Sequence, residues 1–356
     1  MKDVVGKNSE LLYLYDAKMC NPNGDPDEEN KPRMDYETGR NLVSDVRLKR
    51  YLRDYWLALS EDEWRKLGYA PRPDVWGRHV EDKKSGLQQV VSAKDRISAL
   101  AGELGVEDLN ELVKRASQKK GDKERKKLKA FIEQLLTRLV DVRIFGATMP
   151  IGDESGRKGE SITFIGPVQF SWGYSLNRVE ILPSASITSH FASGRPGRGE
   201  EGERYGTMGK DWRVKYSLLT FYGTVSAWRA CHTRLTQQDV ELLDHSLLRA
   251  LPLLATTRSK LGQTPRLYLR VQYKDDRTFL GDPRAWLELE CETGLEDVKD
   301  VQLNFTGFVE RLGSAKDKIE KVGFWAHPDF ASAKQLEKAL AAVGLAIERV
   351  RGLGAS

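Results

Sequence analysis

The turn-rich segment NPNGDPDEENKPRMD, residues 21–35, carries the first side chains in this chain that could do chemistry. Its carboxylates are Asp25, Asp27, Glu28, Glu29 and Asp35. Carboxylates that a fold brings together can hold the divalent ions that assist phosphodiester hydrolysis. The polar spacing of the segment imitates a calcium loop, but Pro26 stands where glycine is needed and Pro32 where a bidentate glutamate is needed. The segment therefore does not predict a calcium site.

Two interpretations of these carboxylates stay open. In the first, Asp25 and Asp35 are metal ligands of a metal-dependent endoribonuclease. In the second, the Asn and Asp side chains bond to their own backbone as Asx-turns, so that the loop is a rigid scaffold. We favour the scaffold, and we expect no metal and no cofactor, because one loop does not by itself supply a ligand set.

Cations form the second set of useful groups. Residues 41–59 are predicted to be a helix, because apolar side chains recur on one face: Leu48, Tyr51, Leu52, Tyr55 and Leu59. Lys49, Arg50 and Arg53 lie roughly opposite, and Arg33 and Arg40 precede the helix. Such a face is often only a solvated helix surface. Here the clustering of cations beside a rigid loop indicates binding of phosphates without reading of bases.

Other catalytic chemistry has no visible machinery in the sequence. The three cysteines are far apart and odd in number, and the five histidines show no ligand spacing. No nucleophile elbow, phosphate-binding loop or dinucleotide fingerprint is present. Acyl transfer, nucleotide hydrolysis and redox chemistry are therefore not indicated.

Composition narrows the class of protein. The chain has 356 residues, 40% of them hydrophobic, and a formal net charge of +5. This charge is only mildly basic, so any nucleic-acid binding should come from local patches. The N-terminus lacks an apolar signal core, and no run of residues is long and apolar enough to cross a membrane. We expect a soluble, cytoplasmic protein with no membrane partner.

The elements that must position these groups can be read along the chain. Residues 11–17 predict a buried strand, and the prolines after it exclude a helix. Residues 60–140 predict a charged helical insertion, with helices near 92–117 and 122–140. Residues 141–151 and 166–177 predict strands, the second with Val168, Phe170, Trp172, Tyr174 and Leu176 on one face.

The remainder of the chain completes the pattern. Residues 180–212 predict a long excursion, flanked by strand-like runs and holding a glycine-rich tip. A helix starts at Thr236 and carries an apolar stripe to 254, and 266–273 predict a strand. Residues 280–356 predict two or three short strands and a helix near 332–343. The order fits an α+β, split βαβ (ferredoxin-like) core with large insertions.

The N-terminal block YLYDAKMCNPNGDPDEENKPRMDYETGRNLVSDVRLKRYLRDY closely resembles the opening of CRISPR-associated backbone subunits of the Csd/Csh group. These are the repeated subunits of type I Cascade complexes. The resemblance continues in DVRIFGATMPI, SITFIGPVQFSWGYSLN, SASITSHF and TTRSKLGQTPRLYLRV, and it spans roughly residues 11–275 in the same order. The resemblance implies a family-seven Cas protein of a subtype similar to I-B.

The resemblance also implies an architecture and a function. It implies a single RRM-like palm over residues 1–356, with a helical finger insertion at 60–140 and a β-hairpin thumb at 180–212. Copies would assemble along a CRISPR RNA and leave its bases free to pair with a target DNA strand. Further partners would be the large subunit, the cap subunit and the repeat-processing endonuclease. Type I members generally lack nuclease activity, so we expect no enzyme, with the endoribonuclease as the alternative.

Carried onto this chain, the resemblance implies a set of RNA contacts in the palm, with Met208 as an apolar wedge in the thumb. The residues expected to bind RNA are Asn21, Asn23, Arg33, Arg40, Ser44, Arg47, Lys49, Arg50, Arg53, Arg143, Gln169, Thr188, His190, Phe191, Met208, Lys210, Arg258 and Lys260.

Overall fold

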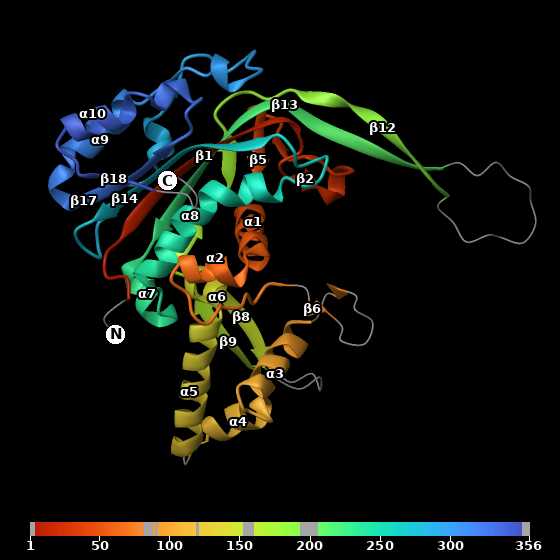
Figure 1. Cartoon of the computed structure of the whole chain (residues 1–356), viewed down its shortest axis with the longest axis vertical. Helices are drawn as coiled ribbons and strands as arrows, with labels where there is room; N and C mark the ends of the chain where they lie inside the picture. Colours follow the sequence, from red (N-terminus) through yellow and green to blue (C-terminus); the bar gives the residue numbers. More distant parts are fainter. Residues whose placement is uncertain are drawn as a thin grey trace, which may run out of the picture.

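A large, mostly antiparallel sheet organises the molecule (Figure 1). The computed structural model describes residues 4–350 except 79, 82–87, 90–91, 119–120, 152–159 and 193–205. The strands run side by side in the order β18-β17-β14-β1-β13-β11-β5-β4, and β10 and β12 also pair with β13. Their bounds are β1 Ser9–Cys20, β4 Met34–Asp35, β5 Arg40–Val43, β10 Val168–Phe170, β11 Gly173–Ser175, β12 Ile181–Ala192, β13 Gly206–Val225, β14 Gln263–Tyr273, β17 Ile319–Ala326 and β18 Ile347–Arg349.

Both faces of the sheet are covered. Helices α1 (Asp45–Ala58) and α8 (Gln237–Leu254) pack on one face against Tyr13 and Tyr15 of β1. On the other face, Leu12 and Leu14 pack against the C-terminal part of the chain, which includes α9 (Thr306–Ser314) and α10 (Leu336–Ala342). Because successive side chains of a strand point to opposite faces, a strand covered on both sides needs a continuous apolar run, as β1 has.

A helical module lies away from the sheet, at the lower end of the view in Figure 1. It contains α3 (Ala93–Glu103), α4 (Leu109–Ala116) and α5 (Asp122–Arg138), and the hairpin of β8 (Gly146–Ile151) and β9 (Glu160–Ile165) packs on them. Its apolar core is separate from the two cores of the sheet and includes Ile97, Phe131, Leu135 and Met149. The module therefore has packing of its own.

The hairpin of β12 and β13 reaches away from the central strands of the sheet, towards the right of the view in Figure 1. Only the second half of β13 lies in the central sheet, where it pairs with β1 from Val214 to Val225. The first half pairs with β12, in a register that sets Ile181 opposite Val214 and Thr188 opposite Met208.

Short elements connect these parts. They are α2 Glu61–Lys66, α6 Val140–Phe145, α7 Ala227–Thr233, β2 Gly24–Asp25, β3 Lys31–Pro32, β6 Val80–Glu81, β7 Gln88–Gln89, β15 Glu288–Leu289 and β16 Leu303–Asn304. Single-turn 3₁₀ helices span Pro26–Glu28, Pro283–Trp286, Val298–Asp300, Lys316–Lys318 and Ala331–Ala333. No helix of the described part of the chain is long and apolar enough to cross a membrane.

Several predicted elements differ from the structure. The helix predicted near 92–117 is divided into α3 and α4. The strand predicted at 141–151 is instead α6 followed by β8, because a short buried apolar run does not distinguish helix from strand. The helix predicted from residue 41 begins at Asp45, where Ser44 caps it, and β5 occupies Arg40–Val43. The strand predicted at 166–177 is broken into β10 and β11, which leaves Trp172 47% exposed.

Candidate nucleic-acid interface

The polar loop after β1 is fastened to the N-terminus of α1. The Asn23 Oδ1 atom accepts hydrogen bonds from the backbone N–H of Ser44 (3.0 Å) and from its hydroxyl (3.1 Å). The Ser44 Oγ atom in turn accepts from the N–H of Arg47 at 3.2 Å. The Asn21 side chain is buried and donates to the Asn30 carbonyl at 2.7 Å, and its Oδ1 has no partner in the part of the chain that the structure describes. The loop is therefore a rigid scaffold beside a helix end that favours anions.

Two cations meet at this helix end. The Lys260 Nζ atom donates to the carbonyl of Asn21 at 2.6 Å. Burial, and then the positive charge of Arg47, lowers the pKa of Lys260 to about 8. The Arg47 guanidinium lies 4.1 Å from the centre of the Tyr51 ring, and its buried Nε has no hydrogen-bond partner among the described residues. Two cations that repel one another, and that have no neutralising carboxylate among the described residues, form a site suited to a phosphate.

More cations gather where the β12–β13 hairpin leaves the sheet. Asp211 Oδ2 accepts from Arg213 Nη2 at 2.8 Å and from Arg258 Nη2 at 3.0 Å, so one carboxylate holds two guanidinium groups. Lys210 pairs with Glu29 at 2.7 Å, and this contact lowers the pKa of the Glu29 carboxyl. Arg213 also reaches β1, where its Nη1 atom donates a hydrogen bond to the carbonyl of Met19 at 2.9 Å.

The three cations predicted opposite the apolar face of α1 are engaged in contacts within the fold. Lys49 pairs with Asp45 at 3.0 Å, and its side chain is only 12% exposed. Arg50 pairs with Asp54 at 2.6 Å. The buried apolar face itself is confirmed, with Leu48, Tyr51, Leu52, Tyr55 and Trp56 buried. Lys49, Arg50 and Arg53 therefore do not form the freely solvated basic face that the helical wheel predicts.

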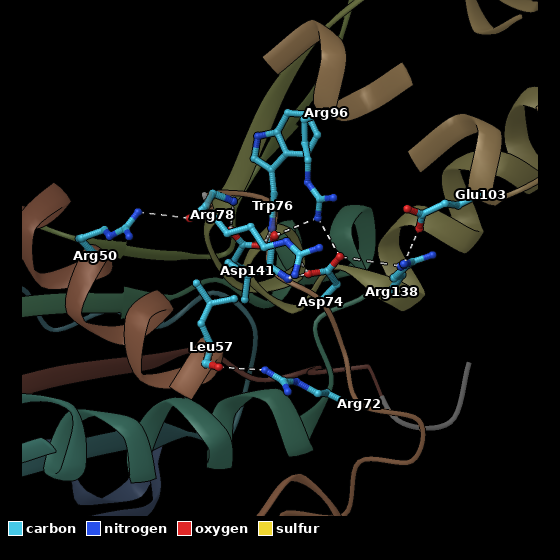
Figure 2. A network of polar contacts seen from close by, with 12 residues as sticks. Arg50, Leu57, Arg72, Asp74, Trp76, Arg78, Arg96, Glu103, Arg138 and Asp141 are labelled. Atoms are coloured by element: carbon cyan, nitrogen blue, oxygen red, sulfur yellow. Dashed lines mark hydrogen bonds and ion pairs between the residues drawn. The ribbon is translucent and has the colours of Figure 1, made fainter. Parts of the chain in front are cut away.

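A polar network around Asp74 and Asp141 lies between α1 and the helical module (Figure 2), and Arg53 of α1 binds to it. Its Nε donates at 2.8 Å to Asp141, a carboxylate with no exposed side-chain surface. Asp141 also accepts from the backbone N–H groups of Trp76 and Gly77, at 2.7 and 3.3 Å. Nearby, Asp74 holds the guanidinium of Arg96 at 2.7 Å. The network fixes the segment that leads into the helical module against α1.

Arg143 is placed inside the fold rather than at the surface. Its guanidinium makes two hydrogen bonds to the buried Asp239, at 2.9 and 2.8 Å. Burial alone would raise the pKa of Asp239, but the hydrogen bonds and charge of Arg143 outweigh it and hold the pKa below its usual value. Arg143 therefore has a structural role in the fold, and its contact with RNA stays a prediction.

The remaining predicted palm residues lie at separate places. Arg40 donates to the carbonyls of β11 and its flank and pairs with Glu292 at 3.0 Å. Arg33 pairs with Asp25 at 2.9 Å. Gln169 is exposed on β10 and accepts from Lys49 at 3.3 Å. Arg40 is thus a link between strands, whereas Arg33 and Gln169 stay accessible at the edges of the interface.

The predicted contacts in the outer hairpin fall on residues whose side chains lie outside the described part of the structure. They are Thr188, His190, Phe191 and Met208, whose backbone belongs to β12 and β13. Their role in binding remains a prediction.

The two carboxylates of the endoribonuclease alternative are not brought together. Asp25 pairs with Arg33 and accepts from the N–H of Asp27 at 3.1 Å. Asp35 accepts from the Thr38 hydroxyl at 2.6 Å, a bond that lowers the pKa of Asp35. Over the described residues, no group of three His, Cys, Asp or Glu side chains could hold a metal ion. Each carboxylate instead stabilises its own turn, so the structure does not support this alternative.

Sequence reasoning missed several members of the interface. Arg213 and Asp211 lie in the apolar-polar run KDWRVKYS, whose alternation predicts a strand but not which partners its polar residues meet. Lys31 lies 4.8 Å from the centre of the Trp212 ring and so joins the loop to β13. These contacts link segments far apart in the chain, and no local pattern signals them.

Comparison with known proteins places this chain in a family. The family model described as CRISPR-associated protein Cas7 matches residues 7–306. The chain is 35% identical over 328 residues to the CRISPR-associated protein Cas7 of Haloferax volcanii, a match that covers 88% of this chain and 84% of that protein.

Two solved structures are also similar. One belongs to a CRISPR RNA-guided surveillance complex in a pre-nicking state, at 18% identity and a TM-score of 0.45, covering 94% of this chain and all (100%) of that one. The other belongs to a CRISPR RNA-guided surveillance complex, at 14% identity and a TM-score of 0.42, covering 96% of this chain and 94% of that one. The family assignment rests on the sequence matches.

Proposed function

This chain belongs to the family of CRISPR-associated protein Cas7, and we propose that it is a non-catalytic subunit that binds CRISPR RNA in the cytoplasm. Copies of the chain line up along the guide and form the backbone of a surveillance complex. The guide, held by its phosphates, keeps its bases available for pairing with a target DNA strand.

The observation that carries this proposal is the pair of cations at the N-terminus of α1. Lys260 has its pKa lowered to about 8 by burial and by Arg47, so the site carries positive charge that a phosphate would neutralise. The rigid loop anchored by Asn23 holds these cations in place. A preformed site of this kind binds the RNA backbone whatever the base sequence. A subunit that must bind guides of many different sequences requires such a site.

The topology supports a ferredoxin-like palm. The strand order β14-β1-β13-β11, with α1 and α8 on one face, is the order in which a split βαβ unit arranges its four strands. In this proposal the hairpin at 180–212 is the thumb and residues 60–140 are the finger insertion. The face opposite the helices is covered by the C-terminal part of the chain, so the guide runs along the strand ends and not across the open sheet.

The proposed partners follow from the assembly. They are CRISPR RNA, neighbouring copies of this chain, a target DNA strand paired with the guide, and the large, cap and repeat-processing subunits. Asp25 and Asp35 act as turn-stabilising groups, and the chain cuts neither RNA nor DNA.

Binding of single-stranded RNA by the full-length protein tests this function. We expect Arg47→Glu and Lys260→Glu each to weaken binding by more than about tenfold for all sequences alike. Arg277→Glu is the matched control, because its side chain is 93% exposed and lies beyond the opposite end of β14. Equal affinities of the three variants and the wild type would refute the assignment of the site.

A second assay separates binding from catalysis. The wild-type protein is incubated with RNA and a divalent ion, and we expect the RNA to stay intact. RNA cleavage that disappears in Asp25→Ala would contradict the proposal and restore the endoribonuclease.

A further inference from the structure

Strand β1 departs from regular β geometry at one residue close to its C-terminal end. Met19 has a φ of +53°, in the left-handed region that side chains other than glycine rarely adopt. Regular pairing with β13 holds at Lys18, opposite Tyr216, and resumes at Cys20, opposite Val214. The Met19 side chain is 47% exposed, although it lies in an otherwise buried strand. The unusual backbone therefore turns an apolar side chain outward.

A second exposed apolar residue lies on the segment that is hydrogen-bonded to this end of β1. The Lys18 N–H donates to the Gly262 carbonyl at 2.9 Å, and the Asn21 N–H donates to the Ser259 carbonyl at 2.8 Å. These two hydrogen bonds bracket Met19 on β1 and Leu261 on the partner segment. Leu261 is 66% exposed. Together Met19 and Leu261 form an apolar step, defined here as these two residues.

Cations lie next to both residues of the apolar step. Arg213 donates to the Met19 carbonyl at 2.9 Å and shares Asp211 with Arg258. Lys260, which precedes Leu261 in the chain, donates to the Asn21 carbonyl. Exposed apolar side chains between cations are the combination that binds single-stranded nucleic acid, since the cations follow the phosphates and the apolar surface packs on bases.

We propose that the Met19–Leu261 step packs against a nucleobase of the bound RNA strand at the junction of the sheet and the β12–β13 hairpin. This inference rests on the proposed function and adds a base contact to the phosphate contacts. Glycine would adopt the backbone of residue 19 without strain. A methionine held there is best explained by what its flexible, polarisable side chain contacts, because such a side chain adapts to any of the four bases.

Two RNA strands separate a base contact from a backbone contact. Binding of the full-length protein is measured to a single-stranded RNA and to a ribose-phosphate strand of the same length that lacks bases. We expect Met19→Ala and Leu261→Ala each to weaken binding of the intact RNA about fivefold. Binding of the strand without bases should stay unchanged in both variants.

A stability measurement separates this contact from a role in folding. Met19→Gly should unfold at a denaturant concentration no lower than that of the wild type, because it relieves the left-handed strain, and yet bind intact RNA as weakly as Met19→Ala. Equal weakening on both strands, or none on either, overturns the base contact while the proposed function stands. A wild-type protein that binds neither strand overturns both.

Discussion

The lowered pKa of Lys260 makes RNA binding depend on pH in a way that can be calculated. With a pKa of about 8, against the ordinary 10.5, the Lys260 amine is mostly charged at about pH 7 and mostly neutral at about pH 9. A bound phosphate restores the pKa of the amine towards its ordinary value, because it supplies the counter-charge that the free site lacks. Linkage then predicts that RNA affinity falls about tenfold between these two pH values.

The stability of the free protein should change in the opposite direction. The native pKa of Lys260 lies below that of the unfolded chain, so the unfolded state binds more protons between about pH 8 and pH 10.5. The contribution of Lys260 to the free energy of unfolding therefore rises with pH across this window, by at most about 3 kcal/mol. Loss of RNA binding towards pH 9 would thus not be explained by unfolding.

Fluorescence anisotropy at constant ionic strength measures this dependence. The RNA should contain only adenosine and cytidine, whose bases keep their charge over this range. Lys260→Arg is the control, since arginine stays charged and should bind with an affinity that does not change with pH. An affinity of the wild type that is flat over this range, or an equal fall in Lys260→Arg, would refute the reasoning.

Three further results are expected. Asp141→Asn should lower the free energy of unfolding in urea by about 3 kcal/mol, because it weakens a fully buried carboxylate network, whereas Asp54→Asn at a partly exposed pair should cost less than about 1 kcal/mol; equal effects would contradict the network. Gly262→Ala should destabilise by about 2–3 kcal/mol, since its φ is +114° and a Cβ would lie 2.2 Å from a carbonyl of β1, while Gly6→Ala, in open space, should be neutral in the same urea titration. Arg47→Ala should reduce the slope of log affinity against log salt by about 1, and an unchanged slope would exclude a phosphate contact.

The regular elements were predictable where a long pattern specified them. The period of apolar residues identifies the buried face of α1, because it repeats over several turns. The Thr236 capping box marks the start of α8, because its two residues are only three positions apart. The run at 141–151 was too short and too uniformly apolar for its period to be read, so a buried helix was taken for a strand.

The sequence predicted many of the residues that belong to the interface, but not which of these side chains interact with one another. The loop at 21–35 and Lys260 were both identified, yet the charge repulsion between Lys260 and Arg47 depends on β14 lying beside β1. Conversely, Arg53 reads as a surface cation on a helical wheel, because the carboxylate that binds it, Asp141, comes from a distant segment. Partners of this kind are decided by the tertiary fold.

Co-expression with a CRISPR array, followed by sizing and extraction of nucleic acid, tests the central claim most directly. We predict that the wild-type protein elutes as a large particle with intact RNA of one spacer-repeat length. The double variant Arg47→Glu/Lys260→Glu should elute small and without RNA. A wild-type protein free of nucleic acid, or a double variant that carries the same RNA, would contradict the claim that this site holds the guide.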